Sequence, residues 1–263
     1  MARFKVTLEY DGTRYSGWQV QKNARTVQGE VHGALRSVLG KGDFELYGSG
    51  RTDAGVHALG QVAHLEAQTV LAPEIIRMKV NDQLPPDINI IEVKKAPRSF
   101  HARHDAVARS YLYQVSRRRT AFGKRYVWWI KDPLDAARMR AAARPFAGMK
   151  DFQSFTDDDP EEKSTKVFLD EILLAEADDL ILLRITGSHF LWKLVRRIVG
   201  VIVEAGRGRL REEEIPALFR PGTDAPSRLT APPSGLFLEK VCYGEEKPSP
   251  ALTPVLTVAH ARQ

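Results

Sequence analysis

The spacing of the apolar residues changes in the same order twice along this chain, and that order constrains the fold more than any other feature. Alternate apolar positions favour strands, and apolar residues every three or four positions favour helices. In the first half they predict strand, helix, strand, strand, helix and strand. The order returns in the second half without a residue-level repeat. This is the ferredoxin-like βαββαβ order, so we predict an α+β fold with two ferredoxin-like halves and a mixed, mainly antiparallel sheet.

Capping and turn residues set the ends of these elements. Thr26 is a typical helix N-cap, Gly40 a typical stop, and Pro73 suits a first helical turn. In the first half we expect strands at residues 3–9, 44–47, 62–65 and 88–93. In the second half we expect strands at residues 110–116, 167–175, 180–185 and 236–243, and helices at 132–146, 190–203 and 212–219.

The simplest domain organisation has two halves and a tail. We assign residues 1–105 to the N-terminal half, residues 106–245 to the C-terminal half, and residues 246–263 to the tail. The tail contains three prolines and no clear period, so we expect it to add no core.

Composition narrows the functional class. No apolar run approaches the roughly 20 residues that cross a bilayer, and the N-terminus lacks the pattern of an export signal. The single cysteine, Cys242, fits a reducing cytoplasm. The 39 Lys and Arg residues exceed the 33 Asp and Glu residues, giving a formal charge of +6. We therefore expect a cytoplasmic protein without a membrane span, and the charge favours a polyanionic partner.

The loop expected at residues 48–60 is the most unusual segment. Three glycines surround Arg51, Asp53 and His57, and glycine permits close approach by another molecule. A structural loop in which Asp53 caps a turn is the alternative. No Gly-Lys-Ser/Thr follows and no helix begins there, which disfavours a phosphate-binding P-loop. We expect His57 to be a structural loop residue and assign it no catalytic role.

The segment GRTDAGVHA at residues 50–58 resembles the signature of the TruA family of tRNA pseudouridine synthases. The resemblance covers residues 3–243. Further matching segments, in the family's order, are YDG at 10–12 with GWQ at 17–19, FHAR at 100–103, YLY at 111–113, DFQSF at 151–155, VRRIVG at 195–200 and GLFL at 235–238.

The resemblance implies a pseudouridine synthase fold with a central active-site cleft. It implies isomerisation of uridine at positions 38, 39 and 40 in the anticodon stem-loop of tRNA, by a homodimer without metal or organic cofactor. By position in the motifs, Asp53 is the nucleophile, Arg51 helps flip the target nucleotide, Tyr111 lies against the uracil, and Arg196 pairs with the catalytic acid. The resemblance places tRNA contacts at Phe100, His101, Ala102, Arg103, His104, Lys163 and Ser164.

The residue types suit this chemistry. A carboxylate can add to C6 of the uracil or react at C1′, and the sequence leaves both routes open. An opposed guanidinium such as Arg196 favours the ionised carboxylate and orients it. Tyr111 offers a flat face to a flipped base, or else packs in the core, as we expect for Tyr113. We expect phosphate contacts from exposed cations, namely Arg14, Lys22, Arg25, Arg103, Lys193 and Arg197.

Two other functions are open. A non-catalytic tandem RNA-binding protein fits the fold, but residues 60–65 lack the aromatic signature of an RRM. An aspartate-dependent phosphatase or hydrolase needs a second acidic cluster near the motif, which is absent from the sequence there. His101 and His104 stand three residues apart without a second ligand pair, so we expect no metal site.

Overall fold

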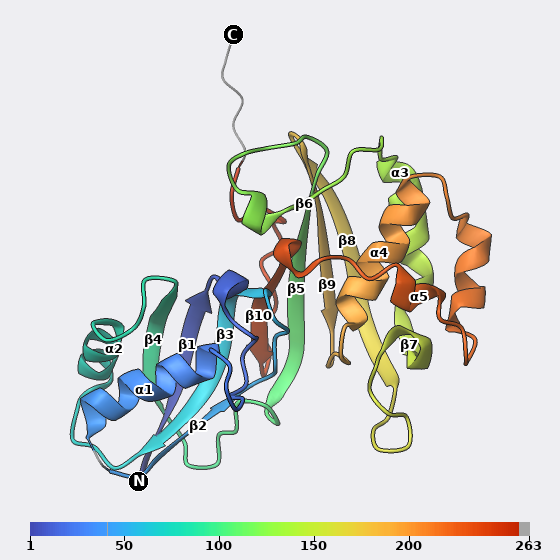
Figure 1. The fold of residues 1–263 in the computed structure, drawn as a ribbon. Coiled ribbons are helices and arrows are strands. Elements are labelled where there is room, and N and C mark those ends of the chain that lie inside the picture. The colour runs from blue at the N-terminus through green and yellow to red at the C-terminus, as the bar shows by residue number, and fades with distance from the viewer. Residues whose placement is uncertain (41, 258–263) are drawn as a thin grey trace. The chain divides into compact units, whose positions relative to one another are not determined.

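The first six predicted elements form one sheet with two helices. A computed structural model describes residues 1–40 and 42–257, and the chain divides into two units (Figure 1). The first unit contains residues 1–107 and 237–248, and the second contains residues 108–236 and the segment that starts at residue 249. The final strand, which the sequence analysis counted with the second half, thus belongs to the first unit from Phe237 onward.

The first unit follows the predicted order. Its elements are β1 (Ala2–Tyr10), α1 (Val27–Leu39), β2 (Phe44–Gly48), β3 (His57–Ala67), α2 (Pro73–Asn81), β4 (Ile88–Ala96) and most of β10 (Leu236–Tyr243). β1 pairs antiparallel with both β3 and β4. β3 pairs antiparallel with β2 and parallel with β10 at Phe237 and Leu238. The helices α1 and α2 lie against each other on one face of this sheet (Figure 1).

The predicted ends of the first helix are confirmed. The Thr26 side chain accepts a hydrogen bond from the Gly29 amide, as an N-cap does, and Gly40 ends the helix with φ = 78°. Pro73 occupies the first turn of α2. On β1 the apolar side chains Phe4, Val6 and Leu8 are buried, as alternation predicts.

The second unit, like the first, combines β-strands with α-helices. Its elements are most of β5 (Ala106–Ser116), β6 (Trp128–Trp129), α3 (Ala136–Ala143), β7 (Gly148–Asp151), β8 (Lys166–Ala177), β9 (Leu180–Gly187), α4 (Leu194–Gly206) and α5 (Ala225–Arg228). Within this unit β9 pairs antiparallel with β5 and β8, and β7 pairs antiparallel with β8. β6 pairs parallel with β5. The α+β class is thus confirmed in both units.

Three predicted boundaries move. β3 begins at His57, so the glycine-rich loop spans only residues 49–56. α3 begins at Ala136 because Asp135 caps it, accepting from the Ala137 and Arg138 amides. α4 begins at Leu194, since the backbone of Lys193 is left-handed, with φ = 63°. The short helix expected at residues 212–219 has the predicted bounds and is a 3-10 helix with Pro216 inside it.

Within the described part of the tail, residues 246–257 form no helix or strand and bury no side chain, as expected of a segment that adds no core. Its backbone nevertheless bonds to side chains of the second unit. The carbonyl oxygens of Ser249 and Ala251 accept from the guanidinium of Arg184, at 2.6 and 2.9 Å. The Val255 amide donates to Oε1 of Gln114 at 2.7 Å. Arg184 and Gln114 are both buried. The tail therefore satisfies polar side chains that the second unit buries.

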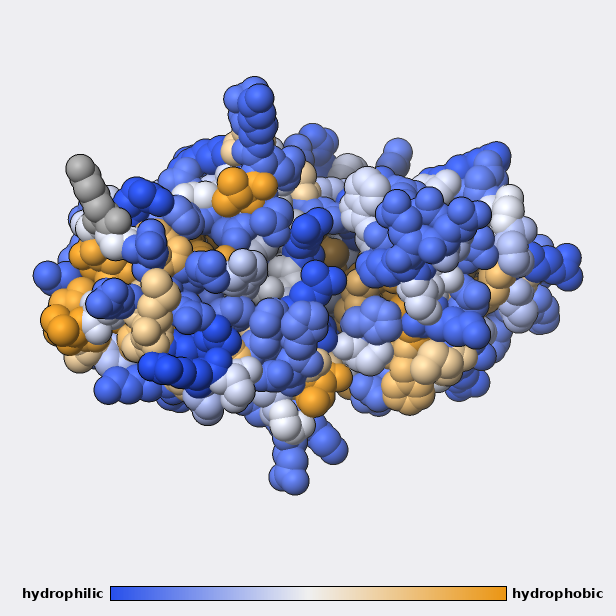
Figure 2. All heavy atoms as spheres, turned by 90° about the horizontal axis from the view of Figure 1, so that it is seen from below, coloured by the Kyte–Doolittle hydropathy of each residue, from blue (hydrophilic) through white to orange (hydrophobic). Residues whose placement is uncertain are grey.

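The face of the molecule drawn in Figure 2 is mostly polar. Hydrophilic side chains cover most of this face, and hydrophobic side chains occur there in small separate groups. None of the helices in residues 1–40 and 42–257 is long and apolar enough to span a membrane.

Candidate active site

The loop between β2 and β3 is fixed at its start by buried polar contacts. The Ser49 amide donates to the carbonyl of Val62 at 2.7 Å, and its hydroxyl donates to Oε1 of Gln61 at 2.8 Å. The Gln61 amide nitrogen donates to the carbonyl of Gly50 at 3.1 Å. Gln61 is fully buried. A loop with buried polar partners holds one conformation, which is what a catalytic loop requires.

Thr52 is held on two sides. Its hydroxyl lies 2.8 Å from the phenol oxygen of Tyr10, and its carbonyl accepts from the Trp18 amide at 3.1 Å. Gly17 permits this approach, because a Cβ there would lie 2.5 Å from the Thr52 carbonyl oxygen. These contacts fix the residue immediately before Asp53.

The end of the loop is a tight turn. The Val56 amide donates to the carbonyl of Asp53 at 3.1 Å, and Gly55 has φ = 76°. The Gly55 amide donates to the carbonyl of Tyr15 at 3.2 Å. Gly12 lies so close that a Cβ on it would be 1.9 Å from the Val56 carbonyl oxygen. Glycine is required at this position for the two segments to touch.

His57 anchors the turn. It is 1% exposed, and its Nδ1 accepts from the Gly12 amide at 3.1 Å. Its ring stacks on Phe237 with centroids 4.8 Å apart. These contacts fit the structural role that the sequence analysis gave it.

Arg51 and Asp53 remain accessible within this rigid frame. Arg51 is exposed, and Asp53 is half-buried. The loop thus brings together two of the predicted site residues and leaves both in reach of a ligand.

The segment Phe100 to His104 forms a separate turn in the same unit. Nδ1 of His101 accepts from the amides of Arg103 and His104, and the His101 amide donates to Asp105 at 2.9 Å. Arg103 and His104 are exposed, so the turn presents them to solvent. Phe100 is half-buried and packs against Tyr243, with ring centroids 5.2 Å apart.

His64 supports this turn from beneath. Its Nδ1 accepts from the amide of buried Ala102 at 3.2 Å, and the Ala102 carbonyl accepts from Tyr243 at 2.6 Å. Burial, together with the neighbouring His101, lowers the pKa of His64 to about 4. Burial and His104 also lower the pKa of His101. The described residues contain no group of three or more His, Cys, Asp or Glu side chains placed to hold a metal ion.

The second unit positions Tyr111 and Arg196. Tyr111, on β5, is half-buried and meets Phe190 edge to face with ring centroids 4.9 Å apart. Tyr113, two residues on, is fully buried, donates to the carbonyl of Pro232 at 2.8 Å, and has a pKa raised by burial. Tyr113 is therefore a packing residue, as predicted.

Arg196 is half-buried on α4 and bonded to a neighbouring segment. Its Nε donates to the carbonyl of Ala231 at 2.6 Å, and its own carbonyl accepts from the Ala231 amide at 3.0 Å. One turn later, a Cβ on Gly200 would lie 1.6 Å from the carbonyl oxygen of Leu229. Helix α4 thus lies directly against residues 229–231, which fixes the base of the Arg196 side chain.

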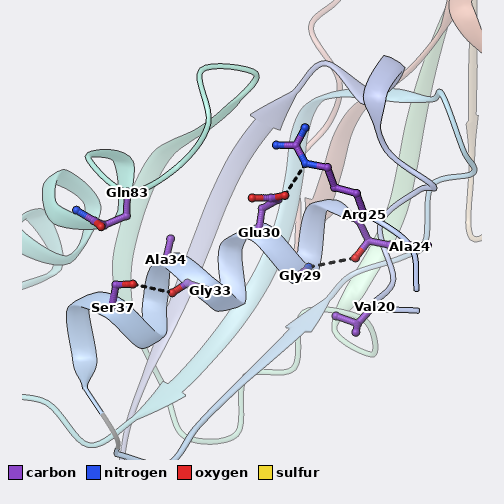
Figure 3. A pocket seen from close by; sticks show the side chains of 10 residues that line it. Val20, Ala24, Arg25, Gly29, Glu30, Gly33, Ala34, Ser37 and Gln83 are labelled. Atoms are coloured by element: carbon purple, nitrogen blue, oxygen red, sulfur yellow. Dashed lines mark hydrogen bonds and ion pairs between the residues drawn. The ribbon is translucent and has the colours of Figure 1, made fainter. Parts of the chain in front are cut away.

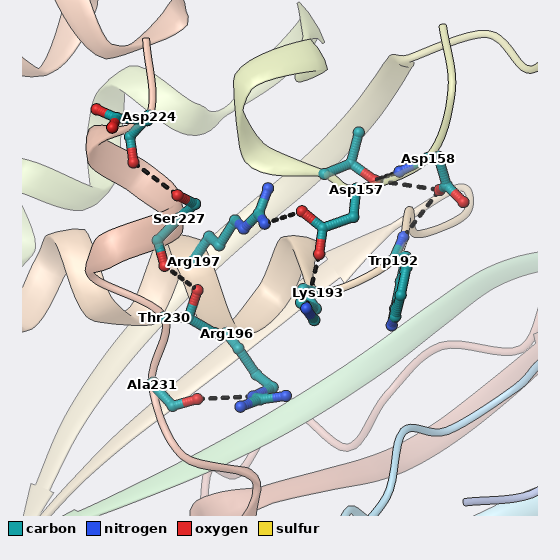
Figure 4. A network of polar contacts seen from close by, with 11 residues as sticks. Asp157, Asp158, Trp192, Lys193, Arg196, Arg197, Asp224, Ser227, Thr230 and Ala231 are labelled. Atoms are coloured by element: carbon teal, nitrogen blue, oxygen red, sulfur yellow. Dashed lines mark hydrogen bonds and ion pairs between the residues drawn. The ribbon is translucent and has the colours of Figure 1, made fainter.

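Asp157 and Asp158, in the loop between β7 and β8, hold the start of α4 (Figure 4). Asp157 forms ion pairs with Lys193, at 2.6 Å, and with Arg197. Burial raises the Asp157 pKa, but hydrogen bonds from Lys193 and Arg197 outweigh it, so the pKa is lowered. Arg197 is 3% exposed, so its predicted role as an exposed phosphate contact is wrong. A sequence pattern cannot show that a carboxylate from another loop covers it.

Lys163 lies in the same acidic loop. Its ammonium is 3.0 Å from Oδ2 of Asp158, which also accepts from the Trp192 amide at 2.9 Å. Ser164 is exposed, and its hydroxyl accepts from the Lys166 amide at 3.4 Å. The structure therefore keeps both predicted tRNA contacts at the surface, with Lys163 paired to an acid.

A pocket in the first unit does not include the candidate catalytic residues Asp53, Tyr111 and Arg196. It follows α1 and is lined by Arg25, Glu30, Gly33, Ser37 and Gln83, among others (Figure 3). Arg25 spans it with an ion pair to Glu30 at 2.6 Å. None of the predicted catalytic residues lines this pocket, so it is not the candidate active site.

Sequence reasoning missed the residues that hold the site. Tyr10, Gln61 and Asp157 touch the loop at residues 49–56 or the start of α4, yet the sequence analysis gave none of them a role. Tyr10 lies in the YDG segment, but only as a matching residue. Gln61 offered one signal, since a polar residue on the buried side of a strand must find a partner.

Comparisons with known proteins agree with the family resemblance that the sequence motifs indicated. The model of the tRNA pseudouridine synthase family matches residues 7–105 and 142–244. The chain is 38% identical to a tRNA pseudouridine synthase A from Thermodesulfovibrio yellowstonii, over 92% of this chain and the whole relative. It is 39% identical to the protein of that name from Geotalea uraniireducens, with the same coverage, and 40% identical to that from Geobacillus sp. WCH70 over 92% of this chain and 98% of the relative. The chain therefore belongs to the TruA family of tRNA pseudouridine synthases, which are isomerases.

Proposed function

We propose that this protein converts uridine to pseudouridine at positions 38, 39 and 40 in the anticodon stem-loop of tRNA, with Asp53 as the nucleophile. Family membership supports isomerisation of tRNA uridines. The observation that supports Asp53 is the anchored loop, whose backbone has buried partners while Arg51 and Asp53 stay accessible. Such preorganisation is how a protein positions a reacting group.

The reaction rearranges one nucleotide without a second substrate. The N1–C1′ bond breaks, a C5–C1′ bond forms, and the proton on C5 is lost while N1 gains one. The Asp53 carboxylate assists by adding to C6 or by reacting at C1′, and it is regenerated when the base rejoins the sugar. Both routes need an ionised carboxylate.

Arg196 and Tyr111 are the proposed partners of Asp53. The Arg196 Nε is bonded to Ala231, and we assign its terminal nitrogens to the Asp53 carboxylate, which a guanidinium binds well. Tyr111 stacks on the flipped uracil, in an orientation that Phe190 holds by edge-to-face packing. Arg51 fills the place of the extruded nucleotide.

The tRNA contacts extend beyond these four residues. Arg103 and His104 are exposed on their turn, which suits contacts to phosphate and sugar. Phe100, His101 and Ala102 shape that turn, and Lys163 and Ser164 offer a second contact. We further propose a cytoplasmic homodimer that needs neither metal nor organic cofactor.

The site assignment is tested with three unmodified tRNAs, each carrying a single uridine at position 38, 39 or 40. The purified protein is incubated with each in the presence of EDTA, and pseudouridine is mapped by chemical probing. Product at all three positions is expected, with none in a tRNA lacking these uridines. Product elsewhere in the tRNA would contradict the proposed positions while leaving the enzyme class intact.

A further inference from the structure

The connection between β9 and α4 presents a large aromatic side chain to solvent. Trp192 is 50% exposed, whereas Leu191 and Leu194 on either side are buried. Single exposed apolar residues are common, so exposure alone assigns no role. What distinguishes Trp192 is how firmly the chain holds it.

Asp158 holds the backbone at Trp192, and Asp157 holds the side chain of the next residue, Lys193. Oδ2 of Asp158 accepts from the Trp192 amide at 2.9 Å, and Lys163 and Thr156 hold that carboxylate in turn, at 3.0 and 3.2 Å. The next residue, Lys193, adopts a left-handed backbone that non-glycine residues rarely use. Figure 4 shows Asp158 and Asp157 meeting this turn from the same loop.

Lys193 also constrains the indole ring. Its ammonium lies 4.6 Å from the centroid of the Trp192 ring and 2.6 Å from Asp157. A cation at this distance attracts the π-face of the indole. The tryptophan is therefore ordered before any ligand arrives, which lowers the entropy that binding must cost.

The same connection carries groups of the proposed active site. Phe190, two residues before Trp192, packs against Tyr111. Arg196 follows Trp192 by four residues on α4. The exposed indole thus belongs to the chain segment that positions the partners proposed for the reacting uracil.

We propose that Trp192 is a stacking platform for an unpaired nucleobase of the RNA substrate, beside the uridine that reacts. This inference rests on the proposed function. An indole face stacks on any base, so the contact adds affinity without reading sequence.

The experiment compares Trp192→Ala, Trp192→Phe and a matched control, Trp129→Ala. Trp129 is 41% exposed on β6 of the same unit and also has a cation near its ring, Arg119 at 5.8 Å. The kinetic constants for pseudouridine formation in tRNA are measured for each. We expect Trp192→Ala to raise KM roughly 10-fold with kcat within about twofold. Trp192→Phe should recover most of the loss, and Trp129→Ala should match the wild type.

Tryptophan fluorescence tests stacking directly, because a purely structural role of Trp192 would not make its emission respond to added RNA. Adding an anticodon stem-loop RNA to the wild type should quench tryptophan emission through stacking. The quenching should be lost in Trp192→Phe and kept in Trp129→Phe.

Three results would overturn the inference while leaving the proposed function standing. The first is an unchanged KM in an active Trp192→Ala enzyme. The second is a fall in kcat alone, which would mean that Trp192 shapes α4. The third is a molar mass, measured by light scattering, that differs between Trp192→Ala and the wild type. This would mean that a second copy of the chain covers the indole. A wild type inactive on every tRNA would instead refute the proposed function.

Discussion

The phenol oxygen of Tyr10 and the hydroxyl oxygen of Thr52 lie 2.8 Å apart in a buried hydrogen bond. Tyr10 ends β1, the central strand between β3 and β4, and Thr52 immediately precedes Asp53. The bond therefore ties the proposed nucleophile to the interior of the sheet. A hydrogen bond of this kind contributes about 1 kcal/mol to stability, and its loss frees the loop as well.

Tyr10→Phe should lower the unfolding free energy by about 1–2 kcal/mol and reduce kcat by more than this stability change explains. Tyr15→Phe is the control, because Tyr15 donates to Asp87 at 2.5 Å and not to a loop side chain. It should lose similar stability with kcat unchanged. Denaturant titrations and initial rates measure both. Equal effects of the two variants on kcat would refute the role assigned to the Tyr10–Thr52 bond.

Substitution by alanine should change stability in opposite directions at two helical glycines. A Cβ at Gly200 would meet the Leu229 carbonyl oxygen at 1.6 Å, so Gly200→Ala should cost about 2–4 kcal/mol of stability and displace α4. At Gly33 a Cβ meets no atom within 4 Å, so Gly33→Ala should add about 0.5–1 kcal/mol. Thermal unfolding distinguishes the pair, and a Gly200→Ala protein as stable as Gly33→Ala would contradict the packing described for α4.

His64 should make stability depend on pH. Because its folded pKa is lowered to about 4 by burial and by His101, the unfolded chain binds a proton near pH 6.5 that the folded protein takes up only near pH 4. The contribution is therefore present above pH 6.5 and is lost as the pH falls from 6.5 to 4. We expect a loss on the order of 3 kcal/mol over this pH range.

His64→Gln tests this pH dependence, because its amide oxygen can still accept from the Ala102 amide. Unfolding free energies are measured between pH 7.5 and 4.5 for both proteins. The variant should show a shallower decline with falling pH. Parallel curves would exclude His64 as the titrating group.

Removing Asp157 should expose the cost of a buried cation. Asp157→Ala leaves Arg197, which is 3% exposed, without its carboxylate, and we expect a loss of about 1–3 kcal/mol. Glu162→Ala, at an exposed acid in the same loop, should change stability by less than about 0.5 kcal/mol. Because the Asp157 pKa is lowered, the difference between the wild type and Asp157→Ala should shrink as the pH falls below about 4. A difference as large at pH 3 as at pH 7 would contradict the ion pair.

Local signals in the sequence predicted the fold well where one residue decides the structure. Thr26 and Gly40 end α1, and Pro73 lies in the first turn of α2. Prediction failed where distant residues decide. The apolar period began at Phe190, but the left-handed backbone at Lys193 delays α4 to Leu194. The two-residue strand β6 is too short to show a period.

The candidate site was likewise predicted where the signal is local in the sequence, and missed where distant residues decide the structure. The motif identified the loop that carries Arg51 and Asp53, because its glycines and its order are local to the chain. The partners that hold the loop, Tyr10 and Gln61, lie outside the motif, and their roles depend on strand pairing. Arg197 was expected to be exposed because helical spacing cannot reveal that Asp157 covers it from another loop.

The most direct test of the central claim compares the wild type with Asp53→Asn on unmodified tRNA bearing uridines at positions 38 to 40. The substitution keeps the size of the side chain and the backbone bond from the Val56 amide to the Asp53 carbonyl, so folding and tRNA affinity should be unchanged. Pseudouridine from the wild type, and none from Asp53→Asn with tRNA still bound, is the predicted result. Equal pseudouridine formation by both proteins would show that Asp53 is not the nucleophile, and binding without product by both would favour a tandem RNA-binding protein.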